Sequence, residues 1–183
     1  MGEVCRKRKK KRKTKQNKRI KKHYSFPSST NKTGFMAVIW EAVLEVLGRP
    51  VYVGSSGCGQ LSKLANQGIV AVTIGAVAEA MLLLERGGAD TAAVRTALRG
   101  GFADSTILQQ HGERMTTGNF IPGGPSKFQL KDLDNVMHEA KKLNLSLPII
   151  KHIQNRFAYL VETMEGGDKD HSALYLELLS HNH

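Results

Sequence analysis

Hydrophobic and polar residues follow helical spacing through most of the chain beyond residue 59. The longest run covers about residues 59–86, and past its first two turns it is apolar on almost every side. A helix of that kind is normally buried at the centre of a bundle. Within it, Gly68, Ala71, Gly75 and Ala78 recur three or four residues apart, a stripe of small residues where a second helix can pack closely.

Shorter helices are predicted after this long one, each marked by a capping residue or a turn. Asp90 can cap a helix over 91–98, and Ser105 a helix that runs towards Met115. Further helices are expected over about 127–142, over 149–164 and, after Asp170, over 173–179. The pattern therefore predicts an all-α domain over residues 57–183, built around one long core helix.

Residues 36–56 follow a different pattern. Apolar residues at helical spacing predict a short helix up to Gly48, and Val51–Val53 form a brief β-prone run that ends at Gly54. Such a short strand needs neighbours to satisfy its backbone hydrogen bonds, and the sequence offers no other strand. The isolated strand indicates that sequence is missing upstream.

The positive charge of the chain is concentrated at its N-terminus. The net charge is +11, yet the first 33 residues hold 14 of the 27 Lys and Arg, and the other 150 residues have a net charge of −2. Residues 1–35 are therefore predicted to be a disordered basic tail. Three interpretations stay open: contact with nucleic acid or a nuclear import signal through residues 6–22, a solvated tail without a role, or a translated A-rich stretch of DNA.

Cysteine and histidine spacing gives no sign of a metal site or a disulfide framework. Cys5 and Cys58 lie in unlike contexts, and the seven histidines lack metal-binding spacing. Neither a secretory signal nor an uninterrupted apolar run of about 18 residues is present, so no membrane segment is expected. The expected location is cytoplasmic, or nuclear if the basic tail is functional.

The stretch from Gly54 to Gln67 combines a glycine-rich turn with a polar start to the long helix. Gly54, Gly57 and Gly59 let the backbone approach a bound molecule closely. Gln60, Lys63, Asn66 and Gln67 fall on one face of the first helical turns. The glycine order is G-x-x-G-x-G, which differs from the dinucleotide-binding order G-x-G-x-x-G, so the pattern predicts a small-molecule site without a cofactor loop.

Lys63 is the residue in this stretch best suited to chemistry, and two interpretations of it stay open. Near the start of a buried helix, desolvation would lower the pKa of its ammonium and make it a useful proton donor. Alternatively, its side chain reaches from the helix end into solvent.

The segment Val53–Asn66 resembles the catalytic signature of the β-hydroxyacid dehydrogenases, a family that includes 3-hydroxyisobutyrate dehydrogenase and tartronate semialdehyde (2-hydroxy-3-oxopropionate) reductase. The resemblance extends over about residues 41–179. The segments Gly100–Ala103 and His111–Met115 favour the tartronate semialdehyde reductase branch. Other segments that resemble family landmarks, in family order, begin at Ala76, Ala97, Lys131 and Asp170.

This resemblance implies roles for residues of the glycine turn. Lys63 is expected to donate a proton to the substrate carbonyl as hydride arrives, and to remove it in the oxidative direction. Either Asn66 or Gln67 is expected to supply an amide that orients the substrate beside the backbone of Gly57 and Gly59.

The resemblance also implies a cofactor, NAD or NADP, and places Lys131 near its nicotinamide end. Judged from the residues alone, Lys131 would be a solvated helix lysine, and Asp132 a local helix-start or hydrogen-bonding group. No metal is expected.

By the same resemblance, residues 57–183 are a helical C-terminal domain of the 6-phosphogluconate-dehydrogenase-like type, and residues 36–56 are the last helix and strand of a Rossmann domain. That domain would supply the cofactor loop, so the chain is expected to be inactive alone. We expect a small β-hydroxyacid or semialdehyde substrate, a homo-oligomer formed through the helical domain, and exposed apolar surface where the Rossmann domain would dock.

Overall fold

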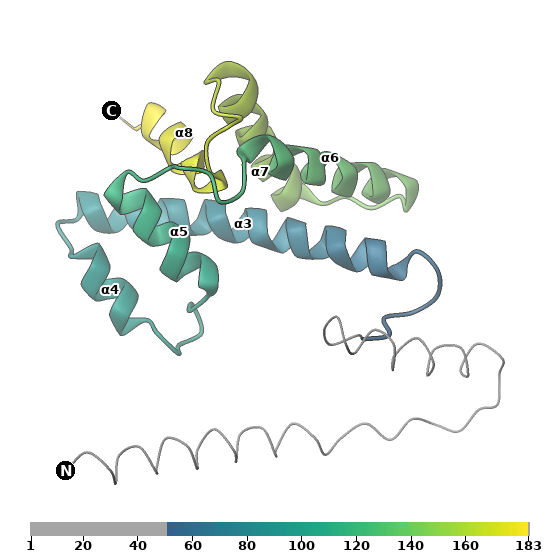
Figure 1. Ribbon diagram of the computed structural model, residues 1–183, viewed down its shortest axis with the longest axis horizontal. Helices are drawn as coiled ribbons and strands as arrows, with labels where there is room; N and C mark the ends of the chain where they lie inside the picture. Colours follow the sequence, from purple (N-terminus) through teal and green to yellow (C-terminus); the bar gives the residue numbers. More distant parts are fainter. Residues whose placement is uncertain (1–50, 183) are drawn as a thin grey trace, which may run out of the picture. The chain divides into compact units, whose positions relative to one another are not determined.

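The computed structural model describes residues 51–182, which form a bundle of helices (Figure 1). The predictions for residues 1–50, including the basic tail and the short helix, lie outside the described residues. The helices follow in this order: α3 (Cys58–Arg86), α4 (Thr91–Ala97), α5 (Thr106–Thr117), α6 (Ser126–Lys142), α7 (Pro148–Ala158), the π-helical turn η1 (Tyr159–Thr163), the 3₁₀ turn η2 (His171–Ala173) and α8 (Leu174–Ser180). The prediction of a helical domain is confirmed.

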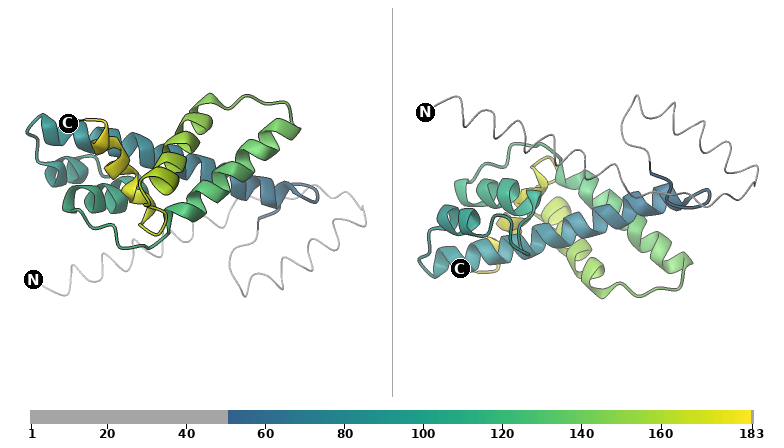
Figure 2. Two further views of the ribbon diagram at one scale, coloured as in Figure 1. Left: turned by 90° about the horizontal axis from the view of Figure 1, so that it is seen from above. Right: turned by 90° about the horizontal axis from the view of Figure 1, so that it is seen from below.

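The long helix α3 runs the length of this bundle, with α4 and α5 beside its C-terminal half and α6 beside its N-terminal half (Figure 2). Its inner face forms the core, where Ala71, Ile74 and Met81 are fully buried. The prediction of burial on every side is wrong for the described residues, because Ile69 is 66% and Leu83 74% exposed. Other helices cover only one face of α3, so its outer apolar residues remain at the surface.

The stripe of small residues on α3 packs against α7. A Cβ atom placed on Gly68 would lie 2.9 Å from Cδ1 of Ile150, and one on Gly75 would lie 2.5 Å from Cδ1 of Ile153. Contacts that close leave no room for a larger residue, because protein interiors are packed to crystal-like density. The predicted close approach of a second helix is confirmed.

Three helix caps predicted from the sequence are present. The Asp90 side chain accepts hydrogen bonds from the N–H groups of Ala92 and Ala93. Ser105 accepts one from Leu108, and Asp170 accepts one from Ser172. Each cap satisfies backbone donors that have no partner inside the helix.

The structure corrects two boundaries near the C-terminus. The helix predicted over 149–164 is α7 followed by the wider turn η1, and the last helix begins with the tighter turn η2. All three helix types place apolar residues three to five positions apart, so spacing alone does not separate them.

The predicted strand at Val51–Val53 is wrong for this structure. These residues are 69%, 71% and 50% exposed and have no regular secondary structure. No neighbouring strand pairs with them within residues 51–182, and a strand is stable only when its backbone donors and acceptors are paired.

By length and composition, α3 is also the one helix of the described part that could cross a membrane. Its most apolar window is 44% buried by the protein itself. It packs against α5, α6, α7 and α8, as the core helix of a helical bundle does.

Candidate functional site

The glycine-rich turn leads directly into the start of α3. Gly54 has φ +133° and Gly57 has φ +93°, backbone conformations that glycine adopts far more readily than other residues. Gly57 is the N-cap of α3, and within the described residues no side chain caps this end and no acid occupies the first turn. The N–H of Cys58 donates to the carbonyl of Ser55 at 3.0 Å. The N–H groups of Gly59 and Gln60 are left for an anion from outside the helix.

Backbone access differs between the glycines of this turn. A Cβ on Gly54 would lie 2.8 Å from Sγ of Cys58, so the chain turns tightly there. A Cβ on Gly57 or Gly59 would meet no atom within 4 Å. The two glycines predicted to bind substrate thus lie on open surface, where a small molecule can reach their backbone.

Helix α6 brings Asp132 against the polar face of α3. The Nε2 of Gln67 donates a hydrogen bond to Oδ2 of Asp132 at 2.6 Å, and Nζ of Lys63 lies 4.0 Å from Oδ1. Asn66 Nδ2 donates to Oε1 of Gln67 at 3.2 Å. The structure therefore gathers Lys63, Asn66 and Gln67 into one group around the Asp132 carboxylate.

Sequence reasoning missed the roles of two α6 residues in this group. Asp132 was expected to act locally on its own helix, but it bonds α3 across the helix interface. Gln129, only 2% exposed, donates from Nε2 to the backbone carbonyl of Gln67 at 3.1 Å and holds the two helices in register. Both contacts join residues more than 60 positions apart, and no local pattern signals such a contact.

The two lysines of the predicted site are both at the surface. The Lys63 side chain is 60% exposed, so of its two interpretations the structure has the one in which the side chain reaches solvent. Its pairing with Asp132 is correspondingly weak, since exposed ion pairs contribute about 0–1 kcal/mol. Lys131 is exposed on α6 and, although adjacent to Asp132 in the chain, does not join the hydrogen-bonded group.

This arrangement defines a class of protein: a helical domain that carries an open polar site at the glycine-started end of its longest helix. Residues 57–178 match the family described as "NAD-binding of NADP-dependent 3-hydroxyisobutyrate dehydrogenase". The chain belongs to the 3-hydroxyisobutyrate dehydrogenase family.

The named relatives of this chain are oxidoreductases. The chain is 45% identical over 144 residues to 2-hydroxy-3-oxopropionate reductase of Escherichia coli, an alignment that covers 77% of this chain and 49% of that protein. It is 30% identical over 138 residues to the probable 3-hydroxyisobutyrate dehydrogenase-like 1, mitochondrial, of Arabidopsis thaliana, covering 75% of this chain and 41% of that one. The chain thus spans about half, or less, of the length of these curated relatives.

Solved structures share the fold. The 3-hydroxyisobutyrate dehydrogenase of Salmonella typhimurium matches with a TM-score of 0.61 and 27% identity, covering 66% of this chain and 42% of that one. The Mycobacterium tuberculosis 3-hydroxyisobutyrate dehydrogenase matches with a TM-score of 0.69 and 22% identity, covering 81% and 52%.

Proposed function

We propose that this chain supplies the substrate-side half of an NAD(P)-dependent oxidoreductase that acts on a small β-hydroxyacid or its semialdehyde, most similar to 2-hydroxy-3-oxopropionate reductase. The observation that carries the proposal is the grouping of Lys63, Asn66 and Gln67 beside an uncapped, glycine-started helix end. The 45% identity to the Escherichia coli reductase supports the choice of substrate class.

The start of α3 is suited to a substrate carboxylate. The N–H groups of Gly59 and Gln60 lie in its first turn, at the positive end of the helix dipole. The open backbone at Gly57 and Gly59 lets an acid group approach without meeting a side chain. Lys63, one turn further along α3, adds a positive charge on the same side.

Lys63 is the proposed proton donor to the substrate carbonyl. In the described residues its ammonium has one weak ion pair, with Asp132 at 4.0 Å, and is otherwise open to a ligand. A general acid must come within hydrogen-bond reach of the oxygen that it protonates, and the long exposed side chain can do so. When a β-hydroxyacid is oxidised instead, the neutral amine takes the hydroxyl proton.

The hydrogen bonds favour Asn66 over Gln67 as the residue that orients the substrate. The amide nitrogen of Gln67 is bound to Asp132 at 2.6 Å and its oxygen accepts from Asn66. The Oδ1 of Asn66 remains available as an acceptor for a substrate hydroxyl. Gln67 is then a positioning residue that holds Asn66 in place.

The residues present fit one side of the nicotinamide end of NAD or NADP. Lys131 is exposed on α6, next in the chain to Asp132, which pairs with Lys63. The open glycine backbone leaves room for a flat ring. The cofactor, when bound, supplies the hydride that joins the carbonyl carbon. The cofactor loop G-x-G-x-x-G is not found in the sequence, so we propose that a Rossmann half must complete the site.

An apolar groove supports the proposal that this domain is covered in the assembled enzyme. It has a volume of about 510 Å³ between α3, α6 and α7, and exposed leucines and isoleucines line it. Exposed apolar surface of this kind is typical of interaction sites. We propose that a second copy of the domain or the Rossmann half covers it; the exposed members are Leu61, Ile69, Leu143, Leu145 and Ile149.

A nucleic-acid role through residues 6–22, with nuclear rather than cytoplasmic location, stays a prediction.

The test is to supply the missing half. A chimera that joins the N-terminal half of the Escherichia coli 2-hydroxy-3-oxopropionate reductase to residues 53–183 should oxidise NADPH or NADH in the presence of 2-hydroxy-3-oxopropionate. The chain alone, under the same conditions, should show no turnover. Robust turnover by the lone chain would refute the need for a Rossmann half, and a folded but inactive chimera would count against the enzyme proposal itself.

A further inference from the structure

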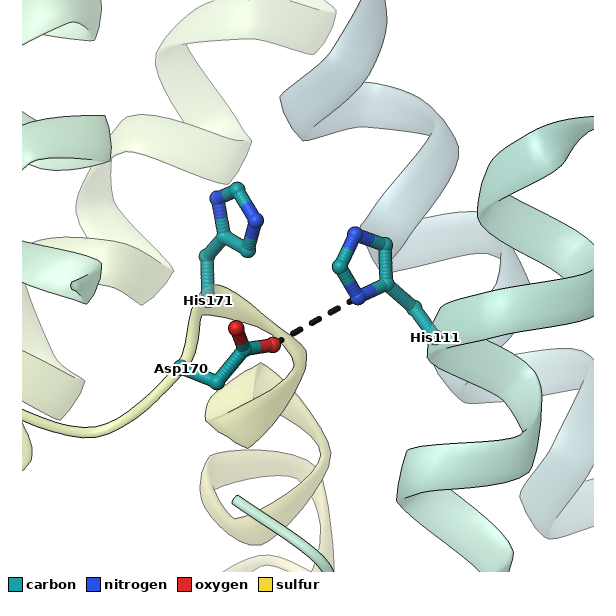
Figure 3. A group of neighbouring side chains, drawn as sticks. All are labelled: His111, Asp170 and His171. Atoms are coloured by element: carbon teal, nitrogen blue, oxygen red, sulfur yellow. Dashed lines mark ion pairs between the residues drawn. The ribbon is translucent and has the colours of Figure 1, made fainter. Parts of the chain in front are cut away.

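A second polar cluster, which the proposed function does not use, lies where the start of η2 meets α5. His111 comes from α5, while Asp170 and His171 come from the start of η2, and the three side chains converge (Figure 3). One ligand atom from each residue lies within 4.8 Å of the other two. The cluster therefore joins two segments that are about 60 residues apart in the sequence.

The carboxylate of Asp170 is buried and held in one orientation. It is 1% exposed and accepts hydrogen bonds from the N–H groups of Gly123 and Gly124 and from both the N–H and the hydroxyl of Ser172. A carboxylate held in one orientation therefore lies at the base of the cluster.

The two imidazoles beside this anion are only partly satisfied. Nδ1 of His111 is buried without a hydrogen-bond partner in the described residues, at 3.4 Å from Oδ1 of Asp170. The ring of His171 meets that of His111 edge-on, with 4.8 Å between their centroids. A buried polar atom without a partner is rare in proteins and calls for an explanation.

We propose that His111, Asp170 and His171 form a binding site for a divalent transition metal ion, with Zn²⁺ as the best-suited member of the class. Two imidazole nitrogens and one carboxylate oxygen are a donor set that zinc accepts, with water as a fourth ligand. The ion would bind Nδ1 of His111, which has no hydrogen-bond partner in the described residues, and would so link α5 to η2.

The distances suit such an ion. Bonds of about 2.0–2.2 Å in a tetrahedron place neighbouring ligand atoms about 3.3–3.6 Å apart. The 3.4 Å between Nδ1 of His111 and Oδ1 of Asp170 already lies in this range. Since all ligand atoms lie within 4.8 Å, His171 must close the remaining gap of at most about 1.5 Å by turning its partly exposed ring.

Two neighbours oppose the ion and set how tightly it binds. The Ser172 hydroxyl donates to Oδ1 of Asp170 at 2.6 Å and must turn away when a metal takes that position, while the Ser172 N–H can stay. The Arg114 guanidinium lies 3.5 Å from Oδ2 of Asp170 and repels a cation. Removing the Ser172 hydroxyl or the Arg114 charge should therefore tighten metal binding, which a purely structural cluster does not predict.

The test is titration of the full chain, freed of metal by a chelator, with ZnCl₂ in a calorimeter. We expect one ion per chain with a Kd below about 100 µM, and a raised Tm when zinc is present. H111A and H171A should each weaken binding by at least about tenfold. The matched control H138A removes an exposed histidine on α6 and should bind as the unchanged chain does.

Further variants keep the result decisive. H111N retains a polar side chain of similar size, and thermal unfolding without metal shows whether each variant is folded. S172A should bind zinc more tightly than the unchanged chain. The proposal is overturned if folded H111A, H111N and H171A bind zinc as the unchanged chain does, if no 1:1 binding is found, or if binding is lost instead on H181A.

Discussion

The two polar clusters of this domain differ in how buried their charged groups are and in how many hydrogen bonds those groups make. At the start of α3, Lys63 is 60% exposed, the helix end is uncapped, and the Cβ positions of two glycines face open space. At the start of η2, Asp170 is 1% exposed and accepts four hydrogen bonds. A charge that is buried and fully hydrogen-bonded is held in place by contacts within the domain, whereas exposed donors around open backbone leave room for a molecule from outside it. This contrast supports the proposal that the start of α3 is one half of a binding site.

The sharpest test of this comparison removes the exposed charge. In the active chimera, K63M should lower kcat/KM by about 10²–10⁴-fold, because a general acid contributes a factor of that size. K151M removes a different exposed lysine, on α7, and should leave the rate unchanged. Equal effects of the two substitutions would show that Lys63 acts only through general charge.

The second test compares the packing of the buried middle of α3 with that of its open start. G75L forces a side chain against Ile153, where a single Cβ would already lie 2.5 Å from Cδ1, and should cost about 1–3 kcal/mol of unfolding free energy. G59L places the same side chain on open surface and should change stability by less than about 0.5 kcal/mol. Urea denaturation of the chain measures both, and a similar loss for the two would contradict the contrast.

The sequence predicts the local features of this domain better than the contacts between distant segments. The small-residue stripe and the caps at Asp90, Ser105 and Asp170 are local patterns, and the structure confirms them. Burial of α3 on all sides was wrong because the pattern records how apolar a face is and does not record whether a neighbour covers it.

The candidate site was predictable only in part. Lys63, Asn66 and Gln67 fall on one face by helical spacing, and the structure brings them together. Their contacts with Asp132 and Gln129, and the meeting of His111 with Asp170, depend on how distant helices pack. No spacing rule carries that information.

A third test concerns a buried phenol near the far end of α3. Tyr175 donates a hydrogen bond to Glu85 at 2.5 Å, and burial, followed by the Glu85 carboxylate, raises the pKa of Tyr175 above that of a free tyrosine. This stabilisation is complete below about pH 10 and is lost as pH rises further, because the unfolded chain then releases the proton first. The unfolding constant should therefore rise by up to about tenfold per pH unit above pH 10.

The variant Y175F should lack this alkaline loss, while Y159F, which alters an exposed ring, should retain it. Denaturant unfolding at pH 9 and pH 11 measures the difference. An alkaline loss in Y175F as steep as in the unchanged chain would show that another group is responsible.

The smallest effect on stability is expected at the outer face of α3. I69K places a charge on a residue that is 66% exposed and lines the apolar groove, so stability should change by about 0.5 kcal/mol or less. Self-association, measured by sedimentation velocity, should nevertheless fall, because the charge interrupts the apolar surface. If I69K associates as strongly as the unchanged chain, the groove is not the contact surface.

The proposal that the start of α3 is half of an active site predicts that Lys63 becomes covered when the missing half is supplied. Chemical labelling of the lysines tests this most directly. Reductive methylation with formaldehyde and a borane, read at each lysine by mass spectrometry, should modify Lys63 and Lys151 at similar rates in the lone chain. In the chimera with NADPH and substrate bound, labelling of Lys63 should slow several-fold while Lys151 is unaffected. Equal labelling of Lys63 in both proteins would contradict the view that the start of α3 is half of an active site.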